Sequence, residues 1–236
     1  IGTQINLNTS DIIGKITLYA TSEEGYKNLT KLSSSSYLKN SETTDPSCSL
    51  KELLENSEGL IILTGNYNNF FGKLFYKNKL KDIEQILNSI KKNYKDRLYI
   101  EIQRHNELQE KNFENYLLNI SKSLQIPLIA TQEIFYLHEE MYEAHDALVC
   151  IGEKNFVDDK NRFKYSNQHY LKSNEELEKL YLDIPEALEN NYNFHLRFNY
   201  KPKKSKPILP SIASNKSVSP EEELSKSAEQ GLEDRL

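Results

Sequence analysis

The sequence has 236 residues, enough for one domain or for one domain with an appendage. Hydrophobic residues make up 37% and charged residues 28%, a composition that predicts a packed core and excludes a wholly disordered chain. A net charge of −5 excludes nucleic-acid binding over the whole surface, because phosphate binding requires clustered Lys and Arg. The two cysteines, Cys48 and Cys150, exclude a disulfide framework, and no apolar run approaches the roughly 18 residues of a membrane span. We therefore expect a cytoplasmic protein with no membrane partner.

Short apolar runs alternate with amphipathic stretches along the first 131 residues. The apolar runs predict strands at residues 15–20, 59–64, 98–103 and 126–131. Apolar residues at helical spacing predict helices at residues 22–32, 50–55, 80–94 and 113–124. Ser22 or Thr21 would cap the first helix, and the polar residues 37–50 are expected to be a loop. This order predicts an α/β fold, with a parallel sheet or a barrel surrounded by helices.

The second half of the sequence is predicted to be more helical. A helical region begins at residues 144–151, and residues 165–198 are expected to form two helices that break before Pro185. Residues 201–218 contain prolines, lysines and serines and are typical of an extended linker. Ser219, Pro220 and Glu222 are typical of a helix start with a capping box. The apolar face of that last helix is predicted at Leu224, Ala228 and Leu232.

Polar side chains follow three of the predicted strands. In parallel α/β folds, chemistry gathers at the carboxyl ends of strands. Here those positions are Asn66, residues 103–105 and residues 132–135. Glu101 and Gln103 share one face of their strand, while Ile100 and Ile102 occupy the other. That polar face would line a site or would form buried, fully hydrogen-bonded structure, and the sequence leaves both alternatives open.

Two further groups of residues have a functional and a structural interpretation. His138 and His145 are seven residues apart and would share a helix face, but metal sites on helices more often use a spacing of four. We therefore favour a structural role for His145 and its neighbour Asp146, and a core position for Cys150. The basic cluster of the predicted linker would contact nucleic acid or remain a solvated segment, and we favour the latter. Its members are Lys201, Lys203, Lys204 and Lys206.

Several blocks of the sequence resemble, in the same order, blocks of the bacterial DNA polymerase III alpha subunit family. They are Glu23–Ser33, Glu58–Gly65, Tyr99–His105, Pro127–Leu137, Ala144–Gly152, Tyr165–Asn191 and Ala228–Leu236. The resemblance implies a PHP domain, which is a distorted seven-stranded β/α barrel. Residues 1–200 would be this domain without its first strands, residues 201–218 a linker, and residues 219–236 the first helix that leads to the polymerase palm. Both ends are expected to be cuts within a longer polypeptide, and the shortened barrel is expected to fold poorly because its sheet edges would be unpaired.

The resemblance also allows the family's metal ligands to be checked one by one. PHP domains with an intact site hold three metal ions through His, Asp, Glu and Cys and support a 3′→5′ exonuclease. The corresponding positions here are Gln4 for a glutamate, Lys15 for a histidine, Asn66 for a cysteine, Glu133 for an aspartate and Phe135 for a histidine. An ammonium repels a cation, a phenyl ring offers no lone pair, and neutral amides bind cations more weakly than anionic ligands do. The resemblance therefore predicts a degenerate PHP domain that binds no metal and has no phosphoesterase activity.

A degenerate site implies a structural role for this segment. The resemblance implies that a separate proofreading exonuclease, the epsilon subunit, docks on the PHP domain, and that the parent polypeptide contacts DNA and the other polymerase III holoenzyme subunits. The Mg²⁺-binding aspartates of the polymerase palm would follow Leu236, so no catalytic residue or cofactor is expected in the segment. The alternative is a metal-dependent PHP phosphoesterase or 3′→5′ exonuclease, which the substituted ligand positions and the palm-like last helix disfavour.

Overall fold

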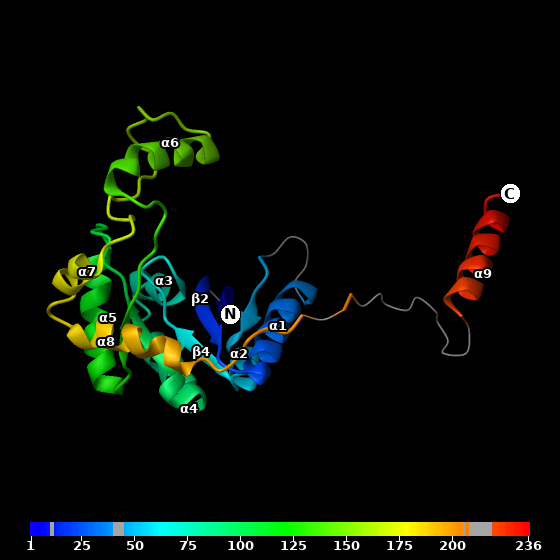
Figure 1. Cartoon of the computed structure of the whole chain (residues 1–236), viewed down its shortest axis with the longest axis horizontal. Coiled ribbons are helices and arrows are strands. Elements are labelled where there is room, and N and C mark those ends of the chain that lie inside the picture. The colour runs from blue at the N-terminus through cyan, green and yellow to red at the C-terminus, as the bar shows by residue number, and fades with distance from the viewer. Residues whose placement is uncertain (10–11, 40–44, 205, 208–218) are drawn as a thin grey trace. The chain divides into compact units, whose positions relative to one another are not determined.

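The computed structural model describes residues 1–9, 12–39, 45–204, 206–207 and 219–236 (Figure 1). These residues form two units, Ile1–Tyr200 and Lys201–Leu236. The first unit contains the sheet and both of the hydrophobic clusters, and the second contains one helix. The mixed α/β class expected from the sequence is confirmed.

The first unit is built on one six-stranded sheet. Its strands are β1 (Gly2–Thr9), β2 (Ile12–Ala20), β3 (Cys48–Ser49), β4 (Leu60–Leu63), β5 (Leu98–Ile102) and β6 (Leu128–Ala130), in the order β3-β1-β2-β4-β5-β6. β4, β5 and β6 are parallel, as expected, but β2 runs antiparallel to both β1 and β4. Of the two predicted arrangements, a parallel sheet or a barrel, the parallel sheet is therefore wrong for β1 and β2. Too few residues separate β1 from β2 for the crossover that a parallel pair requires.

Helices connect and cover these strands. In chain order they are α1 (Glu23–Leu38), α2 (Leu50–Glu55), α3 (Phe70–Tyr76), α4 (Leu80–Tyr94), α5 (Glu110–Leu124), α6 (Tyr142–Glu153), α7 (Asn174–Leu180) and α8 (Pro185–Phe194). The predicted bounds of α2 and α4 are confirmed, and so is the N-cap Ser22 of α1. α1 continues to Leu38, beyond its predicted end at residue 32.

Two further predictions about the helices and strands are wrong. α3 was not predicted, because seven residues are too few to display helical periodicity, yet Phe70, Phe71 and Leu74 are buried. Residues 165–173 were expected to begin a helix, but Tyr170 forms a parallel bridge with Tyr136. The Leu171 amide donates to the Tyr136 carbonyl oxygen, and the His169 carbonyl oxygen accepts from the Phe135 amide, so this part of the chain pairs with an extended segment and does not form a helix.

The sheet has two unequal faces. The larger hydrophobic cluster packs one face against helices α1 to α5. On the other face a smaller cluster contains Ile61, Leu63, Tyr99 and Ile129, with Phe194 and Phe198 packed against it. Because β4, β5 and β6 are buried on both faces, a carboxylate on β5 lies in the interior of the protein.

α8 covers the free edge of β6. The side-chain amides of Asn190 and Asn191 donate hydrogen bonds to the carbonyl oxygens of Leu128 and Ala130. These bonds satisfy acceptors that would otherwise offer a template for another strand. We expected unpaired sheet edges, but α8 covers this one. That the isolated chain folds poorly stays a prediction.

The second unit contains α9 (Pro220–Glu233). Its capping box is confirmed, because Ser219 Oγ accepts from the amide of Glu222 and the Glu222 carboxylate accepts from the amide of Ser219. Leu224 and Leu232, on its predicted apolar face, are exposed. Within the predicted linker, residues 205 and 208–218 lie outside the described residues, and its other residues form no helix or strand. None of the helices in the described ranges is long and apolar enough to span a membrane.

Candidate functional site

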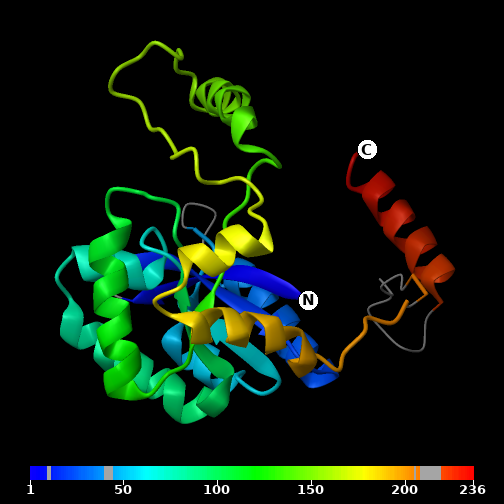
Figure 2. The same ribbon diagram turned by 60° about the vertical axis from the view of Figure 1, so that its left-hand side comes forward.

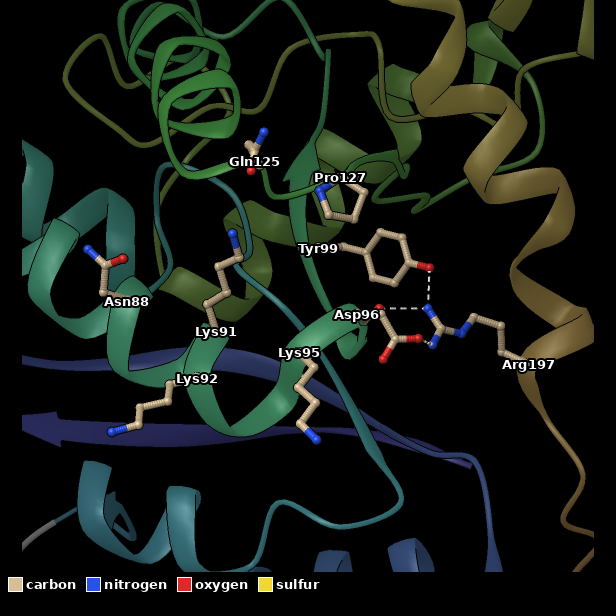
Figure 3. Close-up of a pocket in the computed structure, with 9 residues that line it drawn as sticks. All are labelled: Asn88, Lys91, Lys92, Lys95, Asp96, Tyr99, Gln125, Pro127 and Arg197. Atoms are coloured by element: carbon tan, nitrogen blue, oxygen red, sulfur yellow. Dashed lines mark hydrogen bonds and ion pairs between the residues drawn. The ribbon is translucent and has the colours of Figure 1, made fainter.

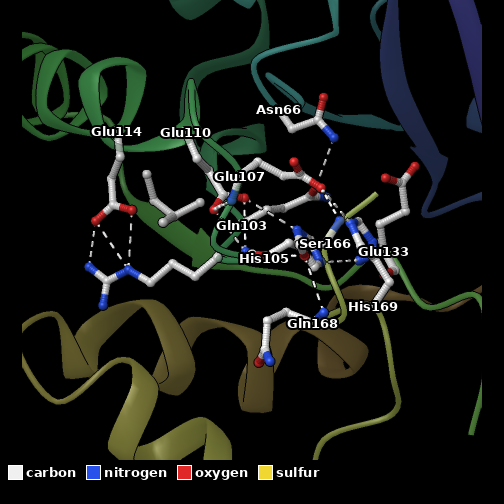
Figure 4. A network of polar contacts seen from close by, with 12 residues as sticks. Asn66, Gln103, His105, Glu107, Glu110, Glu114, Glu133, Ser166, Gln168 and His169 are labelled. Carbon is white, nitrogen blue, oxygen red and sulfur yellow. Dashed lines mark hydrogen bonds and ion pairs between the residues drawn. The ribbon is translucent and has the colours of Figure 1, made fainter. Parts of the chain in front are cut away.

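The carboxyl ends of β4, β5 and β6 meet in one polar network (Figure 4). Asn66 follows β4, and its Nδ2 donates to Oε1 of Gln103, which follows β5, at 3.0 Å. The Gln103 amide donates in turn to Oγ1 of Thr131, which follows β6, at 2.9 Å. The structure therefore brings together the strand-end residues that the sequence indicated.

Glu101 is the buried centre of this network. Only 6% of its surface is exposed, and its carboxylate accepts hydrogen bonds from Thr131 Oγ1, from the Gly65 amide at 3.0 Å and from the Gln103 amide at 3.1 Å. Burial raises the pKa of Glu101 because it disfavours the charged form, although the three donors partly oppose that effect. The sequence left open whether this polar face of β5 lines a site or forms buried, hydrogen-bonded structure. In the structure Glu101 is buried and hydrogen-bonded.

We expect the pH dependence of stability to report on Glu101. An acid whose pKa is raised by folding binds more protons in the folded state, so stability falls as pH rises above its ordinary value of 4.5. The variant Glu101→Gln cannot ionise and should lose this slope. Urea unfolding between pH 4.5 and 7.5 measures it, and Glu58→Gln is the control for an exposed carboxylate. Parallel pH profiles for Glu101→Gln and the parent would contradict the assignment.

Two buried histidines extend the network. The Glu133 amide donates to His105 Nε2 at 3.1 Å, so Nε2 is the acceptor and the proton of the neutral ring lies on Nδ1, which is 3.3 Å from Glu110 Oε1. His169 Nδ1 lies 3.0 Å from the carbonyl oxygen of Glu133 and its Nε2 lies 3.3 Å from Glu107 Oε1. Burial and the neighbouring His105 lower the pKa of His169. Since both His169 contacts are to oxygen acceptors, a second proton must lie on His169 or Glu107 for both to be hydrogen bonds.

Four aromatic rings form a column beside the network. His105 stacks on His169 with 4.2 Å between ring centroids and 1° between planes. Phe135 stacks on the other side of His169 at 4.8 Å, and His145 stacks on Phe135 at 5.0 Å. Phe135 thus separates two imidazoles that would otherwise face each other. His145 Nδ1 is buried without a hydrogen-bond partner.

The predicted pairing of His138 with His145 on one helix face is wrong. His138 is exposed and precedes a short 3₁₀ helix, whereas His145 lies on α6, which begins at Tyr142. Asp146, beside His145, forms an ion pair with Arg162 that has an oxygen–nitrogen distance of 2.6 Å. Arg162 lowers the pKa of Asp146 and holds it as a structural carboxylate, which is the role we favoured from the sequence. The sequence did not indicate Arg162 as its partner, because the two residues are 16 positions apart. The core position of Cys150 is confirmed.

The five positions of the family's metal ligands lie in two environments. Gln4 on β1 and Lys15 on β2 are exposed. Asn66 and Glu133 belong to the polar network, and Phe135 belongs to the ring column. Across the ranges that the structure describes, no group of three or more His, Cys, Asp or Glu side chains is arranged to hold a metal ion.

The sequence did not indicate Glu107, Ser166 or His169 as members of the network. Ser166 Oγ donates to the carbonyl oxygen of His105, and the Ser166 amide donates to Glu107 Oε1 at 2.8 Å. His169 completes the group. About 60 residues separate the two segments that carry these residues, and no local spacing connects them, so periodicity offered no signal.

A basic pocket lies at the opposite ends of the strands (Figure 3). It is open, has a volume of about 790 Å³, and is lined in part by Lys91, Lys92, Lys95 and Arg197. Arg197 is engaged by Asp96 and by the hydroxyl of Tyr99, and Lys91 donates to a backbone carbonyl. Lys91 and Lys92 lie in the last turn of α4 and Lys95 is its C-cap, where cations stabilise the helix dipole. We therefore assign this pocket a structural origin.

The first part of the chain matches a known domain family. Residues 1–105 match the PHP domain family. The matched segment ends at His105, where the chain enters the network of buried histidines. The first part of the chain is therefore similar to PHP domains.

Nearly the whole chain aligns with longer proteins of one name. It is 35% identical over 219 residues to the DNA polymerase III subunit alpha of Caulobacter vibrioides, which is 93% of this chain and 19% of that protein. It is 33% identical to the protein of that name from Rickettsia bellii and 32% identical to the one from Vibrio cholerae, over 95% and 96% of this chain. The chain belongs to the DNA polymerase III alpha subunit family, which confirms the resemblance found in the sequence. It spans about a fifth of the length of these relatives.

Proposed function

We propose that this chain is the PHP region of a replicative DNA polymerase that acts in chromosome replication in the cytoplasm. The names and coverage of the relatives support this proposal. In it, DNA synthesis with Mg²⁺ belongs to palm residues outside this chain, and α9 is the first helix on the way to the palm. The six-stranded sheet would be part of a distorted seven-stranded β/α barrel that residues 1–200 share with preceding strands.

We further propose that this PHP region is a non-catalytic scaffold. The observation that carries the proposal is the ring column, in which Phe135 occupies a predicted ligand position between His169 and His145. The lone pair of His105 Nε2 already accepts an amide proton, and the Glu101 carboxylate already accepts three hydrogen bonds. A metal ion at His105 Nε2 would have to displace the Glu133 amide, because this nitrogen has only one lone pair, and a metal ion at Glu101 would compete with its three hydrogen-bond donors. The alternative function, a metal-dependent phosphoesterase, lacks that support.

A scaffold without its own nuclease requires proofreading from elsewhere. In this proposal the epsilon exonuclease subunit docks on the PHP region, and the parent polypeptide contacts DNA and the remaining holoenzyme subunits. The same logic makes a simple assay decisive: in the absence of epsilon, the whole polypeptide should extend a primer but should not remove 3′-terminal nucleotides.

The metal content of the whole polypeptide tests the scaffold proposal. After dialysis against Zn²⁺ and then against buffer, elemental analysis should find far less than one zinc per chain. A ligand that binds the folded protein and is present at 100 times its Kd stabilises it by about 2.7 kcal/mol. Because we expect no zinc to bind, added Zn²⁺ should leave the melting temperature unchanged. Stoichiometric zinc that disappears in His105→Ala, together with 3′→5′ hydrolysis that disappears in the same variant, would establish the phosphoesterase instead. Lys92→Ala, a change in the basic pocket, is the control.

A further inference from the structure

Exposed apolar side chains gather in one segment of the chain. Of the 22 large hydrophobic side chains that are exposed in the described residues, ten lie between residues 134 and 171. Many of them belong to the segment that we call the α6 arm, residues 137–165, which consists of α6 and the chain on either side of it. In both ribbon views the helix of this arm projects away from the sheet (Figure 1, Figure 2).

α6 presents its apolar side outward. Ala144, Leu148 and Ile151 recur every three or four residues and are exposed, Leu148 by 65% and Ile151 by 75%. The opposite face buries Asp146 and Cys150. A helix on the surface of a globular protein normally has the reverse arrangement, with apolar residues inward and charges outward. On the buried face Arg162 neutralises Asp146, and only 3% and 8% of the two side chains are exposed.

The apolar surface continues beyond the helix. Phe156 is 79% exposed, and Val157 and Phe163 are more than half exposed. The segment is nevertheless held in place, because Arg162 Nε donates to the Val157 carbonyl oxygen and the Tyr142 hydroxyl donates to the Tyr165 carbonyl oxygen. Exposed apolar side chains gathered in one ordered segment are typical of an interaction site. Since the backbone of the arm is tied down before any partner arrives, little ordering entropy opposes docking.

We propose that the α6 arm is a docking surface for another region of the same polypeptide, which covers its apolar stripe in the whole protein. The relatives are about five times as long as this chain, so most of their length lies outside the aligned region. A contact within one polypeptide forms at high effective concentration and needs no second molecule. The arm carries seven acidic and four basic residues, so its occupant should be an apolar groove with a basic rim. The inference does not depend on whether the polar network binds metal.

Cysteine labelling of the whole polypeptide tests the inference. Ile151→Cys and Phe156→Cys place thiols on the apolar surface, and Leu108→Cys places one on a side chain that is 96% exposed elsewhere. The native Cys48 and Cys150 are buried, which keeps their background reaction with a maleimide low. We expect the two arm positions to react at least about tenfold more slowly than position 108, because a covered site must open before it reacts. Labelling of the urea-unfolded variants provides the rate for a fully accessible thiol.

Each other outcome overturns the inference. Labelling of the two arm positions at the rate of the urea-unfolded variants would mean that the arm stays exposed in the whole protein. Protection that appears only when epsilon is added would assign the arm to that subunit, and protection that increases with protein concentration would assign it to a second copy. As a second measurement, Leu148→Glu combined with Ile151→Glu should lower the melting temperature of the whole polypeptide, while Leu108→Glu should leave it unchanged.

Discussion

Replacing Gly25 with alanine is expected to destabilise the protein by about 3 kcal/mol, near the upper end of the usual effect of overpacking. A Cβ at Gly25 would lie 1.9 Å from the carbonyl oxygen of Gly59, so α1 and the turn before β4 would have to separate. That carbonyl cannot move freely, because it accepts hydrogen bonds from the amide and the hydroxyl of Thr21. The gain of about 1 kcal/mol in helix propensity offsets only part of the loss. Urea unfolding followed by circular dichroism measures the difference.

Gly152→Ala is the matched control for this change. Gly152 is also helical, but a Cβ there would meet nothing within 4 Å. Helix propensity alone should then apply, and the substitution should be neutral or stabilising by up to about 1 kcal/mol. If both variants behaved alike, the close approach of α1 to the turn at Gly59 would not be a determinant of stability.

The fold was predictable where local pattern and packing agree. α4 has apolar residues at every position that faces the core, and its predicted bounds match the structure. α2 matches because Ser49 and Glu52 form a capping box. β1 was missed, because its alternating Asn and apolar residues acquire meaning only when they pair with β2. The direction of β2 within the sheet depends on the length of its connections, which a strand pattern does not encode.

The candidate site was predictable only in part. The positions after the strands were indicated correctly, because a strand with both faces buried is a nearly continuous apolar run and most polar side chains follow it at its ends. The segment 165–170 was assigned to a helix, although it supplies Ser166 and His169 to the network. Its backbone bridges the chain after β6, a long-range contact that competes with local helix formation. The ion pair of Asp146 with Arg162 could not be predicted for a similar reason. The chain between them leaves α6 and continues as a loop, which has no periodic pattern that would place Arg162 beside Asp146.

One side chain joins the polar network to the helices that cover β6. Arg104 lies directly between Gln103 and His105, and 16% of its side chain is exposed. Its guanidinium donates to the Glu114 carboxylate of α5 at 3.1 Å and to the Asp183 carboxylate between α7 and α8 at 2.6 Å. It also lies over the ring of the buried Tyr181, with 4.9 Å to the centroid. Arg104 therefore fixes the chain between α7 and α8 against the end of β5, and lysine cannot reproduce its bidentate contacts.

Replacing Arg104 with methionine should cost about 3 kcal/mol, the lower end of the range for breaking a buried ion pair, because the Glu114 side chain is only 15% exposed but that of Asp183 is 61% exposed. Arg104 lowers the pKa of Asp183, so this contribution exists above the ordinary value of 3.8 and is lost as pH falls through the lowered value. The difference between the parent and Arg104→Met in urea unfolding should therefore be largest near pH 7 and should shrink in acid. Lys111→Met removes a neighbouring cation from α5 and should change stability little. A difference that does not depend on pH would mean that Arg104 acts through packing on Tyr181 rather than through its carboxylates.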